Sequence, residues 1–296
     1  MAAFPSKSFD VSGYEAFRPT YPFTLFDTIY AYHSQSGGQF GTCVDLGCGT
    51  GKSMRDLAMR FDKVVGVDPS EAMIEVARKE GGKTKGGEEI GWEIAPSDEL
   101  AFLKDASVDI VTGATCCQYF KYPETWHELS RILKPQGTVA FFNYTRQRLG
   151  SPLSALNPLA DHWSEHVIHA RDVNSTFGIA QDVIVNLSPP EDLFDKATLE
   201  RHLYVGEHWP PEHFNAREEI IMRLKLTWDQ LGGFYRSGRA THRYFERHLE
   251  DRQNPEGDVI TRMMKELKAE AEKMGYKGNV VNVEYPMVLL MVRKTN

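Results

Sequence analysis

The chain has 296 residues, of which 41% are hydrophobic and 25% charged, ordinary proportions for a soluble protein with a sizeable core. Its net charge of −7 argues against nonspecific binding to nucleic acid or to an anionic membrane as the main task. Residues 1–10 lack the features of a signal peptide, and no run approaches the roughly 18 apolar residues of a membrane span. The four cysteines show no disulfide framework. We therefore expect one large domain in a reducing compartment, most simply the cytoplasm, with the nucleus as the alternative.

The first predicted helix covers residues 22–32 and follows a segment rich in aromatic residues and proline. This segment spells Tyr-x3-Arg-Pro-x-Tyr-Pro from Tyr14 to Pro22. A Ser/Gly loop at 34–38 then leads into the first predicted strand.

A glycine-rich turn follows that strand. Residues 43–46 are a short apolar run that contains Asp45, and Gly47, Gly49 and Gly51 stand at every second position before a predicted helix at 54–60. Glycines let the backbone approach a ligand closely at such a turn. A dinucleotide fingerprint fails because Lys52 occupies its last glycine position, and a Walker loop fails because its first glycine falls on Leu46. The pattern acid-x-Gly-x-Gly-x-Gly fits throughout, and a glycine turn without a ligand is the alternative.

The second predicted strand, residues 63–67, ends in another acid, Asp68. Its distance in sequence from Asp45 is close to the spacing at which a carboxylate meets a ribose in βαβ units. A single carboxylate can accept hydrogen bonds from both ribose hydroxyls. The glycine turn and this acid together resemble the motifs of class I S-adenosylmethionine (SAM) dependent methyltransferases.

The resemblance implies a Rossmann-like α/β fold with a mostly parallel seven-stranded sheet, an antiparallel last strand and a helical cap insertion. It implies SAM as the methyl donor, S-adenosylhomocysteine as the product, and a glycine turn that passes under the methionine part of SAM. It also implies cofactor contacts from the strand ends and the loops that follow them: Asp45, Gly47, Gly49, Thr50, Gly51, Asp68, Pro69, Met73, Ser97, Asp98, Ala114 and Gln118.

The N-terminal pattern is similar to that of trans-aconitate methyltransferases and their fungal relatives, where this arm closes over the cofactor. The resemblance makes Tyr14 and Arg18 cofactor-binding candidates. A guanidinium can form a bidentate pair with the SAM carboxylate. A solvent-facing arginine in a proline-ordered arm is the alternative.

Three further strand–helix units continue the alternation and imply a mostly parallel sheet covered on both faces. Helical character at 71–79 precedes a third strand at 91–95, and a fourth is predicted at 107–112. A helix at 124–133 and the turn Leu-Lys-Pro-Gln-Gly lead to a fifth strand at 138–142. In the family, an acid after the third strand accepts a hydrogen bond from the adenine amino group, and the resemblance implies this role for Asp98. Helix capping by Ser97 or Asp98 is the alternative.

The fourth strand runs into Cys116, Cys117, Gln118 and Tyr119. In the family this strand end faces the transferring methyl group, so Gln118 and Tyr119 are catalytic candidates and Tyr119 a substrate-binding one. Trans-aconitate methyltransferases tend to carry a His-Trp pair where Gln118 and Tyr119 stand. This difference affects the assignment of the substrate rather than that of the cofactor. Methyl transfer needs no covalent enzyme intermediate, so the cysteines are expected to be small buried residues.

Residues 145–216 lose the regular alternation and are predicted to cap the pocket, since a bare sheet edge would leave the reacting methyl group in water. A sixth strand is expected near 199–204. The spacing of His162, His166 and His169 could suit zinc, a polar helix face or a wall of the substrate pocket, and we expect no metal. Helices are predicted over 218–231 and 241–249.

An aromatic and basic cluster lies in and between those two helices and resembles a region of fungal trans-aconitate methyltransferases. An anionic substrate could be held there by charge-assisted bonds. The substrate-binding candidates are Trp228, Tyr235, Arg236 and Arg239, and an exposed basic helix is the alternative. A helix at 258–274 and strands at 280–284 and 287–293 complete the chain. We expect a single domain with an arm and helix (1–40), a cofactor core (41–144), a cap (145–257) and a final helix and strands (258–296).

The predicted function is methyl transfer from SAM to a small anionic molecule, most simply to a carboxylate oxygen as in trans-aconitate methylation. Transfer to oxygen, nitrogen, sulfur or carbon of a secondary metabolite is one alternative. A regulatory SAM-binding protein without catalysis is another. No nucleic-acid or membrane partner is expected.

Overall fold

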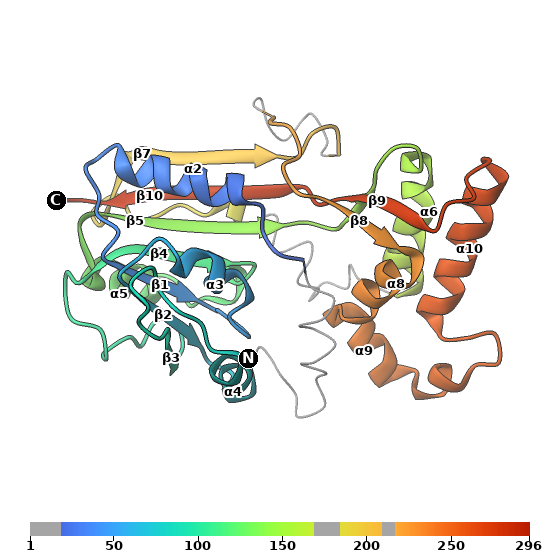
Figure 1. Ribbon diagram of the computed structural model, residues 1–296, viewed down its shortest axis with the longest axis horizontal. Helices are drawn as coiled ribbons and strands as arrows, with labels where there is room; N and C mark the ends of the chain where they lie inside the picture. The colour runs from blue at the N-terminus through green and yellow to red at the C-terminus, as the bar shows by residue number, and fades with distance from the viewer. Residues whose placement is uncertain (1–18, 169–183, 209–216) are drawn as a thin grey trace.

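The computed structural model describes residues 19–168, 184–208 and 217–296. They form a seven-stranded sheet at one end of the molecule and a smaller three-stranded sheet with helices at the other (Figure 1). Tyr14, Arg18 and His169 lie outside the described residues, as does the side chain of Arg239.

The large sheet has the strand order β3-β2-β1-β4-β5-β10-β7. Its strands are β1 (Thr42–Leu46), β2 (Lys63–Asp68), β3 (Gly91–Ile94), β4 (Val108–Ala114), β5 (Leu133–Tyr144), β7 (Phe194–Tyr204) and β10 (Met287–Lys294). The first five pair in parallel, whereas β10 runs antiparallel to both neighbours, β5 and β7. The predicted seven-stranded mixed sheet is therefore confirmed.

Strand β10, which lies beside the edge strand β7, is buried over most of its length. In β10 every side chain from Met287 to Val292 is fully buried, because helices or loops cover both faces. Burying these six side chains stabilises the fold by on the order of 10 kcal/mol before the cost in conformational entropy is subtracted. Alternate residues face two separate apolar cores, with Leu289 in one and Leu290 in the other.

Helices cover the two faces unequally. The first core receives side chains from α2 (Phe23–Ser34), α3 (Lys52–Ala58) and α4 (Glu71–Glu80). The second core receives α5 (Glu124–Ile132), which contributes Trp126, Leu129 and Ile132. The parallel strands and these helices bring the carboxyl ends of β1, β2, β4 and β5 to one edge of the sheet, the edge at which open α/β sheets bind ligands.

The cap lies beyond that edge and contains a second sheet of order β6-β9-β8, which is antiparallel. Its strands are β6 (Arg148–Leu149), β9 (Val280–Glu284) and β8 (Arg223–Thr227). Its helices are α6 (Asn157–His162), α8 (Trp228–Arg236), α9 (Arg239–Arg247) and α10 (Val259–Lys273), with a π-helical turn, η3, at Trp163–Val167. The first core continues into the cap without a break.

The prediction of a helix over 218–231 is wrong for the first part of that range. Strand β8 occupies Arg223–Thr227, where Leu224 and Leu226 alternate with polar residues and pair with β9. The helix begins after Thr227, whose side chain accepts a hydrogen bond from the backbone of Gln230 while the Gln230 side chain accepts one from the Thr227 amide. This capping box fixes the start of α8 at Trp228.

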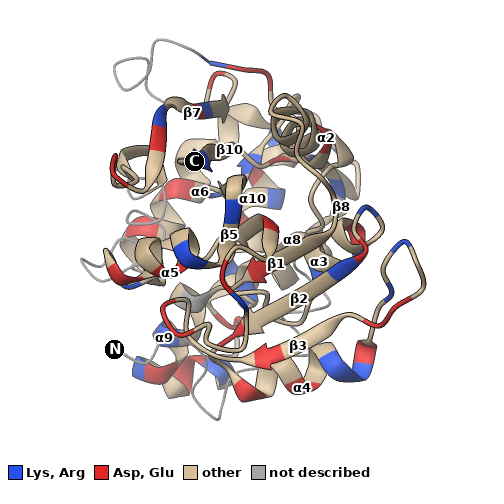
Figure 2. Ribbon diagram, turned by 90° about the vertical axis from the view of Figure 1, so that its left-hand side faces the viewer, with Lys and Arg blue, Asp and Glu red and all other residues tan. Residues whose placement is uncertain are grey.

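Charged residues of both signs share the same elements, as on α4 and α5 (Figure 2). Within the described ranges, none of the helices combines the length and the apolar character needed to cross a membrane.

Candidate functional site

The glycine turn after β1 has the conformation that its sequence predicts. Gly47, Gly49 and Gly51 have φ values of 63°, 56° and 79°, in the left-handed region that glycine adopts without strain. A Cβ at Gly47 would lie 2.6 Å from the Cβ of Cys116, and one at Gly51 would lie 2.3 Å from the Trp92 ring. A Cβ at Gly49 would meet no heavy atom within 4 Å. The turn is thus packed against protein at both ends and open at its middle glycine.

Asp68 ties this turn to the end of β2. One carboxylate oxygen accepts a hydrogen bond from the Gly49 amide at 3.0 Å, and the other accepts one from the Ser70 amide at 2.8 Å. Burial raises the pKa of Asp68, while these two bonds oppose the rise. A carboxylate has about four lone-pair directions, so it keeps the capacity to accept two more hydrogen bonds.

Asp45 is completely buried at the end of β1. Its Oδ1 accepts a 2.6 Å hydrogen bond from the Thr112 hydroxyl on β4, and its Oδ2 is buried without a hydrogen-bond partner among the described residues. Burial raises the pKa of Asp45 to about 6, with a smaller contribution from the charge of Asp68, whereas the Thr112 bond lowers it. An orphaned buried carboxylate oxygen is costly and favours a cationic or hydrogen-bond-donating partner.

Ser97 and Asp98 follow β3 as predicted, but they have protein partners. The buried Ser97 hydroxyl bonds to that of Thr125 at 2.8 Å, and Asp98 lies 3.4 Å from the Lys121 ammonium. Lys121 is shared with Glu124 at 3.3 Å and is largely exposed. An exposed ion pair of this kind contributes little to stability, so it would yield readily to a ligand.

The end of β4 makes a tight turn into the 3-10 helix η1 (Cys117–Tyr119). Ala114 and Gln118 are half-buried, and Tyr119 is exposed. The Gln118 amide donates to the Thr115 carbonyl at 3.0 Å, and the Cys116 thiol contacts the Leu46 carbonyl at 3.0 Å. This turn therefore lies directly against the glycine turn.

The cysteines are all buried thiols. Burial raises the pKa values of Cys43, Cys48, Cys116 and Cys117, which disfavours the thiolate needed for nucleophilic chemistry.

The remaining predicted cofactor residues surround the same turn. Thr50 is 2% exposed and Met73 is 4% exposed on α4, where its amide donates to the Ser70 side chain, whereas Pro69 is exposed. The structure thus gathers the predicted residues from Asp45 to Met73, and those of the β4 end, at one edge of the sheet.

The predicted substrate residues of the cap have structural partners. Trp228 is buried and its indole nitrogen donates to the Gly278 carbonyl at 3.2 Å. Tyr235 lies among Arg146, Arg148 and Asp161, and burial raises its pKa to about 12. Arg239 begins α9.

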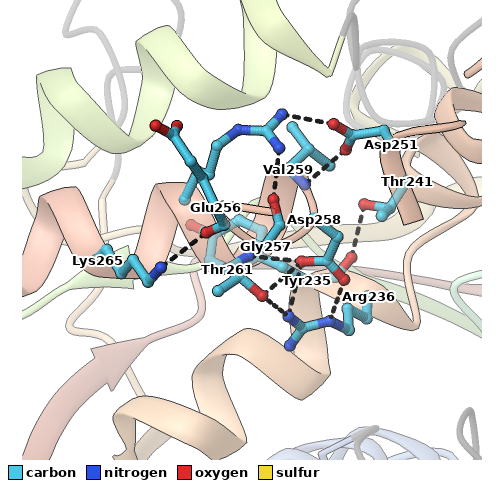
Figure 3. A network of polar contacts seen from close by, with 11 residues as sticks. Tyr235, Arg236, Thr241, Asp251, Glu256, Gly257, Asp258, Val259, Thr261 and Lys265 are labelled. Carbon is cyan, nitrogen blue, oxygen red and sulfur yellow. Dashed lines mark hydrogen bonds and ion pairs between the residues drawn. The ribbon is translucent and has the colours of Figure 1, made fainter. Parts of the chain in front are cut away.

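Arg236 contacts the start of α10 (Figure 3). Its guanidinium makes two bonds to Asp258, at 3.1 and 2.9 Å, and one of 2.8 Å to Thr261. Burial alone would raise the pKa of Asp258, but bonds from Arg236 and Thr261 lower it to about 2. Arg236 therefore has a carboxylate partner within the cap.

The exposed rings of His162 and His166 lie 5.4 Å apart. Among the described residues, no group of three or more side chains has the arrangement of a metal site.

The sequence analysis did not identify three residues that support this site. Thr112, which orients Asp45, and Trp92, which supports Gly51, carry no local signal. Tyr21, whose hydroxyl bonds to that of Thr115, belongs to the N-terminal pattern and could have been found there.

Comparison with known proteins places this edge in context. Residues 44–141 match the family model described as a methyltransferase domain. CRG1 of Saccharomyces cerevisiae, named a probable SAM-dependent methyltransferase, is 33% identical over 152 residues, or 51% of each chain. A Dictyostelium discoideum protein provisionally named a methyltransferase is 26% identical over 285 residues, covering 95% of this chain and 92% of that one. The chain spans about half the length, or less, of most other curated relatives described.

A solved structure from Anaeromyxobacter dehalogenans, provisionally named a type II methyltransferase, has the same fold. It superposes with a TM-score of 0.66 at 20% identity and covers 94% of this chain and 98% of that one. The two chains therefore share the overall fold.

Proposed function

We propose that the protein is a SAM-dependent methyltransferase that transfers the methyl group of SAM to a small-molecule acceptor; residues 44–141 match a methyltransferase domain, and the similar CRG1 is named a probable SAM-dependent methyltransferase. The observation that supports this most directly is the open middle glycine between two buried strand-end carboxylates, Asp45 and Asp68. When bound, SAM supplies an activated methyl group on a sulfonium. The protein has to bind SAM, align the acceptor and exclude water.

The residues of this edge fit SAM in charge and in shape. The unpartnered Asp45 oxygen suits the ammonium end of the methionine part, and the space beside Gly49 lets that part approach the backbone. Asp68 retains acceptor capacity for the ribose hydroxyls, and Asp98 could exchange Lys121 for the adenine amino group.

For the acceptor we propose a carboxylate oxygen of a small organic acid. The turn after β4 presents Gln118 and Tyr119, which can donate hydrogen bonds, and neither His nor a carboxylate occurs between Thr115 and Phe120. A carboxylic acid with a pKa of about 4 is ionised at neutral pH and needs no general base, whereas a hydroxyl acceptor would need one.

The test is transfer of labelled methyl from SAM to a panel of small di- and tricarboxylic acids, trans-aconitate included, followed by mild base treatment. We expect label that base releases, as from a methyl ester. Label that survives base would overturn the carboxyl proposal and indicate an ether, amine, thioether or carbon product.

A second arm separates catalysis from simple binding. Calorimetric titration with SAM should show binding by the wild type and weaker binding by Asp68→Ala, by about tenfold for the loss of a buried hydrogen-bonding carboxylate. SAM binding without transfer to any acid or to a metabolite extract would favour the regulatory alternative. No binding would overturn the proposed function itself.

A further inference from the structure

The turn at the end of β4 contains a backbone conformation that its residue does not favour. Thr115 has a φ of +56°, in the left-handed region, where a β-branched residue is a clear outlier. Such strain persists when surrounding contacts over-determine it, and it concentrates at functional sites. The residue lies next to Ala114 and three positions before Gln118, inside the segment proposed to face the acceptor.

Three hydrogen bonds hold Thr115 in this conformation. Its backbone amide donates to the Phe142 carbonyl on β5 at 2.8 Å, and its carbonyl accepts a hydrogen bond from the side-chain amide of Gln118 at 3.0 Å. Its hydroxyl bonds to the Tyr21 hydroxyl at 2.7 Å. The first two belong to the strand and its own turn, whereas the third comes from a distant part of the sequence.

Tyr21 is placed to make that bond by its packing. Its half-buried ring meets Phe142 edge-on, with ring centroids 4.8 Å apart, and lies 5.9 Å from the ring of Tyr144. Both partners belong to the carboxyl-terminal part of β5, so Tyr21 lies across the ends of β4 and β5. It stands two residues before α2 and therefore connects the start of this helix to the ends of β4 and β5.

We propose that Tyr21 is a positioning residue for methyl transfer: its hydroxyl fixes the left-handed turn at Thr115 and thereby aims Gln118 and Tyr119 at the acceptor. This proposal rests on the proposed function. The ring supplies packing and the hydroxyl supplies orientation, so the two contributions can be separated by removing one oxygen atom.

The first variant is Tyr21→Phe, which keeps the ring and removes the bond. We expect kcat to fall about five- to tenfold, the effect of one hydrogen bond that acts on the reacting geometry. The dissociation constant of SAM and the melting temperature should stay close to wild type, because the glycine turn is untouched. Tyr30→Phe is the matched control, since Tyr30 lies on α2 against Phe40 and Phe61. It should leave kcat unchanged.

A double-mutant cycle assigns the effect to the pair. Thr115→Val should lower kcat as Tyr21→Phe does, and the double variant should be no slower than either single one, since both remove the same bond. Thr115→Ser keeps the hydroxyl and should retain wild-type kcat. The positioning role would be overturned if the losses in kcat of the two single variants multiplied in the double variant, or if Tyr21→Phe kept the wild-type kcat. It would also be overturned if Tyr21→Phe lost SAM affinity in parallel with kcat.

A measurement independent of turnover keeps the two proposals apart. Hydrogen exchange of the Tyr119 and Phe120 amides, which bond to Cys116 and Cys117, should be faster in Tyr21→Phe than in wild type and unchanged in Tyr30→Phe. Unchanged exchange in Tyr21→Phe would overturn the inference even if the enzyme is active. A wild type that transfers no methyl group but shows the exchange difference would overturn the proposed function alone.

Discussion

At the scale of single residues, the burial of Asp45 shifts its pKa, and this shift should make ligand binding depend on pH. Its pKa of about 6 lies above the ordinary value near 4, because the folded protein removes the carboxylate from water. Since the folded state favours the protonated form, the stability contributed by Asp45 is present below pH ~4 and is lost as the pH rises through about 6. A bound cation beside Oδ2 would reverse this preference.

We therefore predict that SAM affinity depends on pH through Asp45. A ligand that requires the ionised carboxylate should bind about tenfold more tightly at pH 7 than at pH 5, since the unliganded group titrates between these values. Calorimetric titration at pH 5, 6 and 7 measures the effect. In Asp45→Asn the affinity should be lower and nearly independent of pH. The same pH profile in both proteins would mean that another group titrates, provided that melting curves show the variant folded.

The positions of Asp45 and Asp68 could be predicted because each ends a short apolar strand, and strand ends in a parallel sheet meet at one edge. The side-chain contacts around these strand ends could not be predicted. Thr112 faces Asp45 through the pairing of β1 with β4, and Tyr21 meets Thr115 across most of the core domain. Such contacts depend on sheet register and tertiary packing, which no local sequence pattern encodes, although Tyr21 itself belongs to the N-terminal pattern.

At the scale of elements, the glycine turn allows two effects of a substitution to be measured separately: strain in the backbone and loss of the space that a ligand would occupy. Gly49 and Gly87 both have left-handed backbones and open space where a Cβ would go, but only Gly49 belongs to the turn after β1. An alanine in this conformation costs about 1–2 kcal/mol at either position. The two positions therefore form a matched pair.

We predict that Gly49→Ala and Gly87→Ala lower the melting temperature similarly, while Gly49→Ala alone weakens SAM binding, by about tenfold or more as a methyl group enters the ligand's space. Thermal melting and calorimetric titration of both variants make the comparison. Equal SAM affinity in the two variants would show that the space beside Gly49 lies outside the cofactor site.

The core elements were predictable because strand and helix patterns alternate regularly, and the cap was less so. The helix predicted over 218–231 merged β8 with α8, although Leu224 and Leu226 alternate with polar residues and Thr227 begins a capping box. The two-residue strand β6 has no pattern of its own and exists because β9 pairs with it.

At the scale of the whole molecule, cap and core share one apolar cluster, and the chain passes from one to the other between β5 and β6, between β7 and β8, and between β9 and β10. The crossings are bonded to one another, since the Thr145 amide donates to the Pro286 carbonyl and the Tyr285 amide to the Met222 carbonyl. The cap is therefore continuous with the core rather than appended to it.

We predict that the protein unfolds in one cooperative step. Scanning calorimetry should give a calorimetric enthalpy close to the van't Hoff enthalpy, and near- and far-ultraviolet circular dichroism should melt at the same temperature. Two resolved transitions would show that cap and core fold independently despite their common cluster.

The position of β10 between β5 and β7 also sets an order of events on the ribosome. Strand β7 pairs with β10 as its sheet neighbour, yet β10 is synthesised only after the whole of β8, α8, α9, α10 and β9. Until Met287–Lys294 leaves the exit tunnel, β7 lacks its partner in the large sheet and the first five strands end at an uncovered β5. The nascent chain must therefore carry an exposed strand edge through most of its second half, the period in which chaperone binding would protect it best.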